Sequence, residues 1–100
     1  ASSSDYRLKE NIKPITGGIE RLKNLKPSRF SWKEEPGTEQ DGFIAHEVQE
    51  IVPEAVGGDK DAINDDGTIN PQQLDPSKLV PLLTAALQEL TARVEALEGN

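Results

Sequence analysis

The fold is decided by residues 75–98, which read DPSKLVPLLTAALQELTARVEALE. Asp75 and Pro76 are typical of a helix N-cap and first turn, and after the early Pro81 no helix breaker follows until Gly99. Apolar residues then recur at the heptad spacing of a coiled coil. The a positions are Val80, Leu87 and Val94, and the d positions are Leu83, Leu90 and Leu97. We therefore predict one long C-terminal helix with an apolar stripe.

Two packing modes are open to this helix. Leu79, Leu82 and Ala86 widen the apolar stripe in the first half, as expected for a helix that packs on its own domain. From Leu87 onward the stripe narrows to the a and d positions, which favours a coiled coil between chains.

The oligomeric state is indicated by the end of the helix. The a and d residue types are compatible with a dimer. Residues 93–98, RVEALE, resemble the short trimerisation pattern of three-stranded coiled coils, in which Arg93 would pair with Glu98 of a neighbouring chain. We predict a homotrimer. The predicted trimer contacts are Val80, Leu83, Leu87, Leu90, Arg93, Val94, Leu97 and Glu98.

Composition supports association and excludes several classes of partner. Of 100 residues, 34% are apolar and four are aromatic, so the core of one subunit is modest. The net charge of -7 would repel a phosphate backbone, which argues against nucleic acid. The absence of cysteine excludes disulfides and thiolate metal sites. The longest apolar stretches, such as residues 79–83, are far shorter than the ~20 residues of a membrane helix, so we predict no membrane partner. No cofactor-binding motif occurs, so we predict no cofactor.

Residues 5–56 have the pattern of a small α+β unit. Phe30 and Trp32 alternate with polar neighbours, as in a half-buried strand. The fold class that we predict is α+β and mainly helical, with a helix–hairpin–helix unit, a protruding arm and the long C-terminal helix. The expected elements of the unit are a short helix that starts at residue 5 and ends by Pro14, a helix over 19–26, a strand over 29–33, a turn at 34–37, a strand over 42–45 and a helix over 46–52.

Residues 57–74 are rich in Gly, Asp, Asn and Pro. A structureless loop of this length is uncommon in a compact domain, so we interpret the segment as a protruding arm, a loose hairpin that turns at Asp66 and Gly67. Its four aspartates do not have the spacing of an EF-hand calcium loop. Such a loop needs oxygen ligands at alternate positions and a glycine at the sixth, and this segment has Ile63 and Asn64 there. We therefore predict a solvated acidic loop and no metal site.

Four short strings of the sequence resemble a known family. They are SDYRLKENI at 4–12, GFIAHEV at 42–48, VPE at 52–54 and LVPLLTAALQEL at 79–90. Together and in this order they are similar to the intramolecular chaperone and self-cleaving domain (the S74 peptidase family) at the C-terminus of phage endosialidases, tail fibres and neck appendages. The resemblance implies a homotrimer that folds an upstream β-rich client, in the host cytoplasm during virion assembly, and then cuts itself off.

The resemblance also implies a catalytic dyad. Ser4 occupies the position of the family's nucleophile, Lys9 that of its base, and the scissile bond would be Ser3–Ser4. A straight helix places Ser4 and Lys9 roughly 140° apart, and a straight strand places them on opposite faces. A dyad therefore needs a turn between the two residues, or a Lys9 from another subunit. The alternative for the same string is a helix start, with Ser4 or Asp5 as N-cap and Lys9 paired with Asp5.

Two features depart from the family pattern. His46 stands where a glutamine is expected; as the sole histidine it is a conceivable general base, but no second ligand or nucleophile lies near it in sequence, so we expect it to cap or pack at a helix start. Residues 1–3 still precede Ser4, which leaves open whether the chain is cleaved at this bond.

The predicted organisation is a single domain. Residues 1–4 are a linker and cleavage boundary, 5–56 the α+β unit, 57–74 the arm and 75–98 the coiled-coil helix. Two other functions remain open, namely a permanent trimerisation cap that does not cleave and the same module in a membrane-tethered transcription factor.

Overall fold

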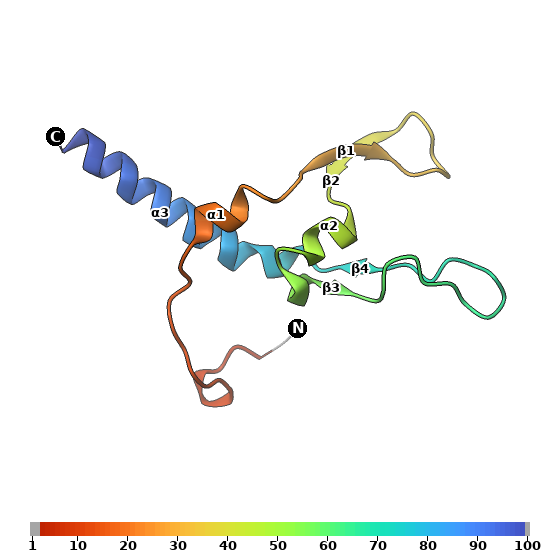
Figure 1. Cartoon of the computed structure of the whole chain (residues 1–100), viewed down its shortest axis with the longest axis horizontal. Helices are drawn as coiled ribbons and strands as arrows, with labels where there is room; N and C mark the ends of the chain where they lie inside the picture. The colour runs from red at the N-terminus through yellow and green to blue at the C-terminus, as the bar shows by residue number, and fades with distance from the viewer. Residues whose placement is uncertain (1–2, 100) are drawn as a thin grey trace.

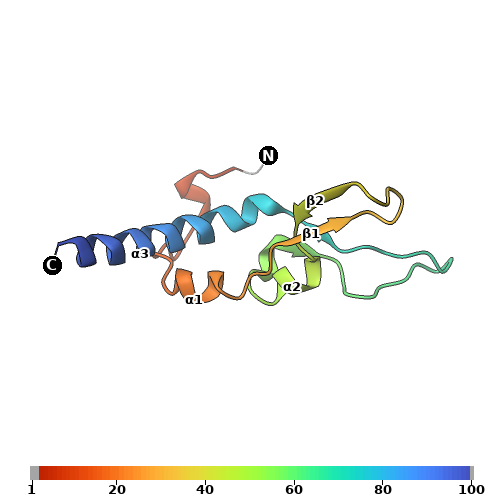
Figure 2. The ribbon, with the colours of Figure 1, turned by 90° about the horizontal axis from the view of Figure 1, so that it is seen from above.

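The computed structural model describes residues 3–99 and is a small α+β fold with a long C-terminal helix, as predicted. In Figures 1 and 2 the helix α3 projects from one end of the molecule and two β-ribbons project from the other. The elements are η1 (Tyr6–Leu8), α1 (Gly18–Leu22), β1 (Ser28–Ser31), β2 (Glu39–Gly42), α2 (Ala45–Gln49), η2 (Pro53–Ala55), β3 (Val56–Gly57), β4 (Gln73–Leu74), η3 (Pro76–Leu79) and α3 (Val80–Glu98), where η marks a 3-10 helix.

The chain is extended for its length. Its Cα radius of gyration is 17.7 Å, whereas a compact domain of this size has a radius of about 13 Å. Many large apolar side chains are consequently exposed. Within residues 3–99, no helix combines the length and apolarity needed to cross a membrane.

The C-terminal helix begins as the sequence predicts. The Asp75 side chain accepts a hydrogen bond from the Ser77 backbone N–H, which caps η3, and η3 runs directly into α3. Leu79, Leu82 and Ala86 are buried against the chain's own domain. The prediction that the first half of the helix packs within its own subunit is therefore confirmed.

The core is small and lies where this first half of the helix meets α2 and η2. Burial of each large apolar side chain contributes roughly 1.5–3 kcal/mol to the free energy of unfolding. Because only a few such side chains are buried, the core stabilises the chain only modestly. The buried apolar residues within the described chain are Val48, Val52, Ala55, Leu79, Leu82 and Ala86.

Helix α1 packs against α3 at a very short distance. Gly18 is buried there, and a Cβ atom at this position would lie 2.9 Å from the backbone nitrogen of Ala86. Gly17, in front of it, has a φ of 68°, a left-handed conformation that suits glycine. The Ile19 backbone N–H donates to Glu89 Oε2 at 3.3 Å, so a side chain of α3 accepts at the N-terminus of α1.

The hairpin of β1 and β2 is displaced from its predicted position. Strand β1 covers most of the predicted first strand, and the Phe30 and Trp32 rings touch edge to face with centroids 5.1 Å apart. The second strand was predicted over 42–45, which is wrong, because β2 ends at Gly42 and pairs Gln40 with Phe30. The apolar run after Gly42 instead enters the core, where Phe43 packs.

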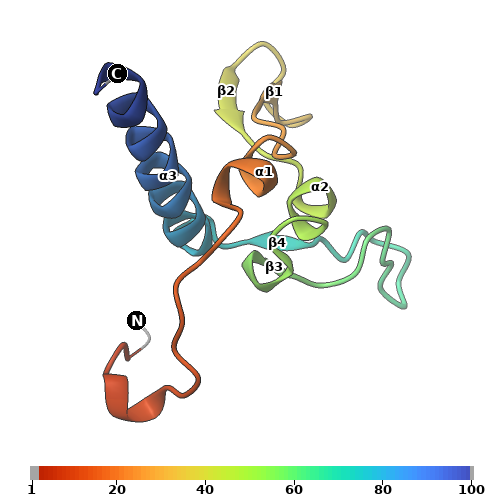
Figure 3. The ribbon, with the colours of Figure 1, turned by 60° about the vertical axis from the view of Figure 1, so that its left-hand side comes forward.

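The predicted arm is a hairpin whose base is closed by the pairing of β3 with β4. Farther out, Ile63 and Ile69 form an isolated antiparallel bridge. Near the tip, Asn64 N–H donates to the Thr68 carbonyl at 2.9 Å, and Gly67, with a φ of 87°, lies in the turn. The segment is thus ordered by its own hydrogen bonds and protrudes from the core (Figures 1 and 3).

Three predicted helices differ from those observed. The helix expected from residue 5 to Pro14 is wrong, because only the single turn η1 forms and residues 9–17 are not helical. The helix expected over 19–26 covers only Gly18–Leu22, and the helix expected over 46–52 covers Ala45–Gln49. Such short segments have few internal hydrogen bonds, so tertiary contacts decide where they end.

Candidate functional site

Ser4 and Lys9 meet at the N-terminal end of the described chain. Lys9 Nζ donates a hydrogen bond to Ser4 Oγ at 2.7 Å. The turn that joins them is η1, which begins after Asp5 and ends where Lys9 returns to an extended backbone conformation. The structure therefore brings together, within one subunit, the two residues that a straight helix or strand would keep apart.

The turn stands away from the rest of the molecule. The N-terminal segment extends to one side of α1 and α3 in both Figure 1 and Figure 3. Ser4, Lys9 and all three residues of η1 are exposed. A lysine amine accepts a proton from a hydroxyl only where burial or nearby cations favour its neutral form. Neither Ser4 nor Lys9 is buried in the chain.

Asp5 organises this turn. Its Oδ1 accepts from the Arg7 backbone N–H at 2.9 Å and from Arg7 Nε at 3.0 Å, and its Oδ2 accepts from Arg7 Nη2 at 2.8 Å. The hydrogen bonds from the Arg7 side chain, followed by the one from its backbone, lower the pKa of the Asp5 carboxyl from its ordinary value of 3.8. The same side-chain contact raises the pKa of the Arg7 guanidinium.

The capping alternative is therefore correct in one part and wrong in another. Asp5 does cap the turn, as that alternative expects. Its charge partner is Arg7, two residues on, and Lys9 reaches Ser4 instead. The signal for this ion pair in the sequence is the pair of opposite charges two residues apart, Asp5 and Arg7. Side chains at this spacing meet across a tight turn but not along a regular helix.

The apolar stripe of α3 is exposed along its whole length. The exposed fractions of its a and d residues run from 43% for Val94 to 78% for Leu97. Because Leu79, Leu82 and Ala86 face the core, the a and d residues lie on a surface that the subunit itself leaves uncovered. Contiguous exposed apolar surface of this kind marks an interaction site.

Arg93 has a partner within its own helix. Its Nη2 donates to Glu89 Oε1 at 3.0 Å, and Glu89 in turn accepts from Ile19. A pair between Arg93 and Glu98 of another chain stays a prediction. The role of Glu89 at the start of α1 was not foreseen, because it depends on a contact across 70 residues.

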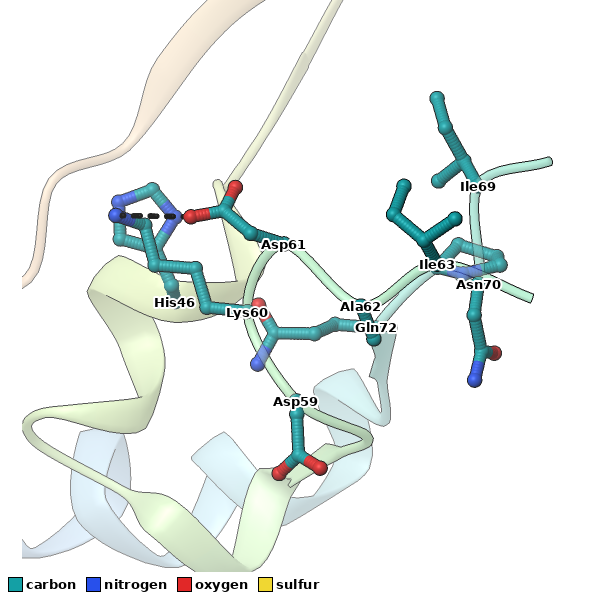
Figure 4. Close-up of a pocket in the computed structure, with 10 residues that line it drawn as sticks. His46, Asp59, Lys60, Asp61, Ala62, Ile63, Ile69, Asn70 and Gln72 are labelled. Carbon is teal, nitrogen blue, oxygen red and sulfur yellow. Dashed lines mark ion pairs between the residues drawn. The ribbon is translucent and has the colours of Figure 1, made fainter. Parts of the chain in front are cut away.

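A shallow pocket of about 340 Å³ lies at the base of the arm (Figure 4). It is lined by His46, which lies in α2, and by residues of the arm, where Lys60 and Asp61 form an ion pair at 3.7 Å. Asp66 lies elsewhere, at the tip, where hydrogen bonds from the Thr68 side chain and then its backbone lower the pKa of the Asp66 carboxyl. Residues 3–99 contain no cluster of three or more potential metal ligands.

Comparison with known proteins identifies a family and finds similar phage tail fibre proteins. The model of the Peptidase_S74 family, described as the chaperone of endosialidase, matches residues 4–57. The long tail fiber proteins Gp37 of Enterobacteria phages K3 and T2 are each 33% identical to the chain over 102 residues. These alignments cover 97% of this chain, but only 8% of the K3 protein and 7% of the T2 protein. The chain thus spans less than a tenth of the length of the relatives it matches.

Proposed function

Because the chain belongs to the Peptidase_S74 family, the chaperones of endosialidase, we propose that it is a homotrimeric assembly chaperone that releases itself from a phage tail fibre by cutting its own chain. Two observations support the client. The relatives are long tail fibre proteins, and they match this chain almost from end to end while extending far beyond it. The site of assembly would be the cytoplasm of the host cell, where a virion component is made.

The proposed trimer forms through α3. Its exposed a and d residues supply the apolar surface, and three helices together would bury the stripe that one subunit leaves in water. Registering three identical helices also registers the three chains attached ahead of them. This is how a C-terminal domain helps an upstream fibre to start folding as a trimer.

The proposed cleavage rests on one observation, the 2.7 Å hydrogen bond between Lys9 Nζ and Ser4 Oγ. In neutral form, Lys9 takes the proton of the Ser4 hydroxyl while Oγ attacks the carbonyl carbon of Ser3. The C–N bond to Ser4 then breaks, and Lys9 returns the proton to the Ser4 nitrogen. This leaves the acyl group of Ser3 as an ester on Oγ.

Water completes the reaction by hydrolysing this ester. The products are a Ser3 carboxylate and a Ser4 residue with a free hydroxyl and a free amino group. Each subunit reacts once on its own chain. Since the Lys9 side chain is exposed in a single chain, we infer that neighbouring subunits cover the site after assembly and exclude water from it.

Mass measurement tests the cleavage directly. A chain that retains about 20 of its natural upstream residues is expected to lose everything before Ser4, since flexible chain ahead of a folded domain leaves its fold intact. Lys9→Ala should block this release, whereas Lys13→Ala, which removes another exposed lysine of the same segment, should not. An intact mass for the unaltered chain would instead identify a permanent trimerisation cap.

A mixing experiment tests whether the dyad forms within a subunit. Trimers assembled from Ser4→Ala and Lys9→Ala chains contain no subunit with both groups. If Ser4 and Lys9 act within one chain, as their hydrogen bond suggests, such mixed trimers should release no upstream residues. Release from the mixed trimers would assign the lysine to a neighbouring subunit.

A further inference from the structure

The turn that carries the proposed dyad has little intrinsic stability. It is a single 3-10 turn closed by two backbone hydrogen bonds of 3.1 Å, from Leu8 N–H to the Asp5 carbonyl and from Lys9 N–H to the Tyr6 carbonyl. None of the η1 residues is buried. Isolated turns of this length are not stable in water, because each fixed backbone angle costs conformational entropy. The meeting of Ser4 and Lys9 therefore needs a further local contact.

Asp5 and Arg7 supply that contact. One carboxylate oxygen accepts from both the backbone N–H and Nε of Arg7, and the other accepts from Nη2. A guanidinium that meets a carboxylate with two parallel N–H groups is the most directional ion pair that side chains make. Because the same Asp5 oxygen also caps the backbone, the contact fixes the carboxylate and the first turn together.

We propose that Asp5 and Arg7 are positioning residues, which form a clamp that closes the turn and so holds Lys9 Nζ at Ser4 Oγ. The proposal rests on the proposed self-cleavage and assigns no chemical step to either residue. Its consequence is that the clamp sets the fraction of time in which the amine and the hydroxyl are in contact. The rate of cleavage should follow that fraction.

Three substitutions separate the parts of the clamp. Asp5→Ala removes the cap and the ion pair, and should lower the cleavage rate roughly 5- to 30-fold. Asp5→Asn keeps a side-chain acceptor for the cap but loses the charge, and should lower the rate roughly two- to fivefold. Arg7→Lys keeps the charge but lacks the planar fork, and should resemble Asp5→Asn. Glu10→Gln, which removes a carboxylate at the end of the same segment, is the matched control.

The experiment measures the rate of release of the natural upstream residues by mass spectrometry, together with the melting temperature and the oligomeric mass. Because the clamp makes no contact with the core, both structural quantities should stay unchanged in all variants.

Two outcomes would overturn the proposal, and they are distinguishable. If the unaltered chain cleaves, Lys9→Ala does not, and Asp5→Ala and Arg7→Lys cleave at the full rate, the clamp is refuted while the proposed function stands. If the unaltered chain releases nothing, the proposed cleavage fails and the clamp fails with it.

Discussion

Replacing Gly18 with alanine is expected to loosen the contact between α1 and α3. The added Cβ would lie 2.9 Å from the backbone nitrogen of Ala86, 3.1 Å from its Cα and 3.2 Å from the carbonyl carbon of Ala85. Carbon atoms in ordinary contact are about 3.5–4.0 Å apart. The atoms that obstruct the methyl group belong to a helix backbone, which has no rotamer to change. The two helices must therefore move apart by roughly half an ångström.

The expected cost is the balance of two effects. Overfilling a packed contact costs about 1–3 kcal/mol. Gly to Ala, where the backbone conformation allows it, gains about 0.4–1 kcal/mol because the unfolded chain loses freedom. The free energy of unfolding should consequently fall by about 1–2 kcal/mol. For a domain of this size the melting temperature should then fall by roughly 4–15 °C.

The assay is thermal unfolding followed by circular dichroism at one fixed subunit concentration, since association stabilises the folded state. Gly57→Ala is the matched control, because Gly57 is exposed and a Cβ there meets nothing within 4 Å. The control should melt at the temperature of the unaltered chain or slightly above it. If Gly18→Ala is stabilised as much as the control, the close approach of α1 to α3 is incorrect.

Three further predictions concern α3 and its cap. Leu90→Asp places a charge in the apolar stripe and should reduce the mass measured by sedimentation to that of one chain. Ala92→Asp, on the opposite side of the helix, should leave the mass unchanged. An unchanged mass for Leu90→Asp would contradict the coiled coil. Glu89→Ala should lower the melting temperature more than Glu95→Ala, because only Glu89 accepts at the start of α1; equal shifts would contradict this role. Hydrogen bonds from the Ser77 side chain and then its backbone lower the pKa of the Asp75 carboxyl from 3.8. The ionised carboxylate therefore stabilises the folded chain above pH 3.8, and this contribution is lost as the pH falls below that value. The difference in melting temperature between the unaltered chain and Asp75→Ala should therefore shrink from pH 7 to pH 3, and a constant difference would refute the assignment.

The C-terminal helix was predictable because its signals are local and agree with one another. The Asp75 cap, the early prolines and the apolar repeat all specify the same helix. The sequence also indicated which apolar residues of the helix face the core. Leu79, Leu82 and Ala86, which lie outside the a and d positions, are the ones that are buried. Whether the remaining stripe joins three chains depends on partners that one subunit does not contain.

The shorter elements were predicted less well because tertiary contacts set their limits. The apolar residues after Gly42 indicated a strand, but they follow β2 and lead Phe43 into the core. The contact of Gly18 with Ala86 joins segments far apart in sequence, and its local signal, a pair of glycines, is that of an ordinary turn. Geometry required either a turn between Ser4 and Lys9 or a Lys9 from another subunit, whereas the closure of the observed turn by Asp5 and Arg7 could be found only from the side-chain positions.

The exposure of the N-terminal turn is the reason why the proposed cleavage should depend on the proposed assembly. The proposed dyad is already in contact within one chain, yet it lies on an exposed segment with uncovered apolar side chains at Tyr6, Leu8 and Ile12. Contact alone does not complete the proposed site, because both side chains are exposed to water. In the proposed trimer a neighbouring chain would cover the turn, and the exposed stripe of α3 would bring that chain near. A Leu90→Asp chain should therefore keep the dyad in contact and still release nothing, while Ala92→Asp releases its upstream residues; full release from the Leu90→Asp monomer would show that one subunit is sufficient.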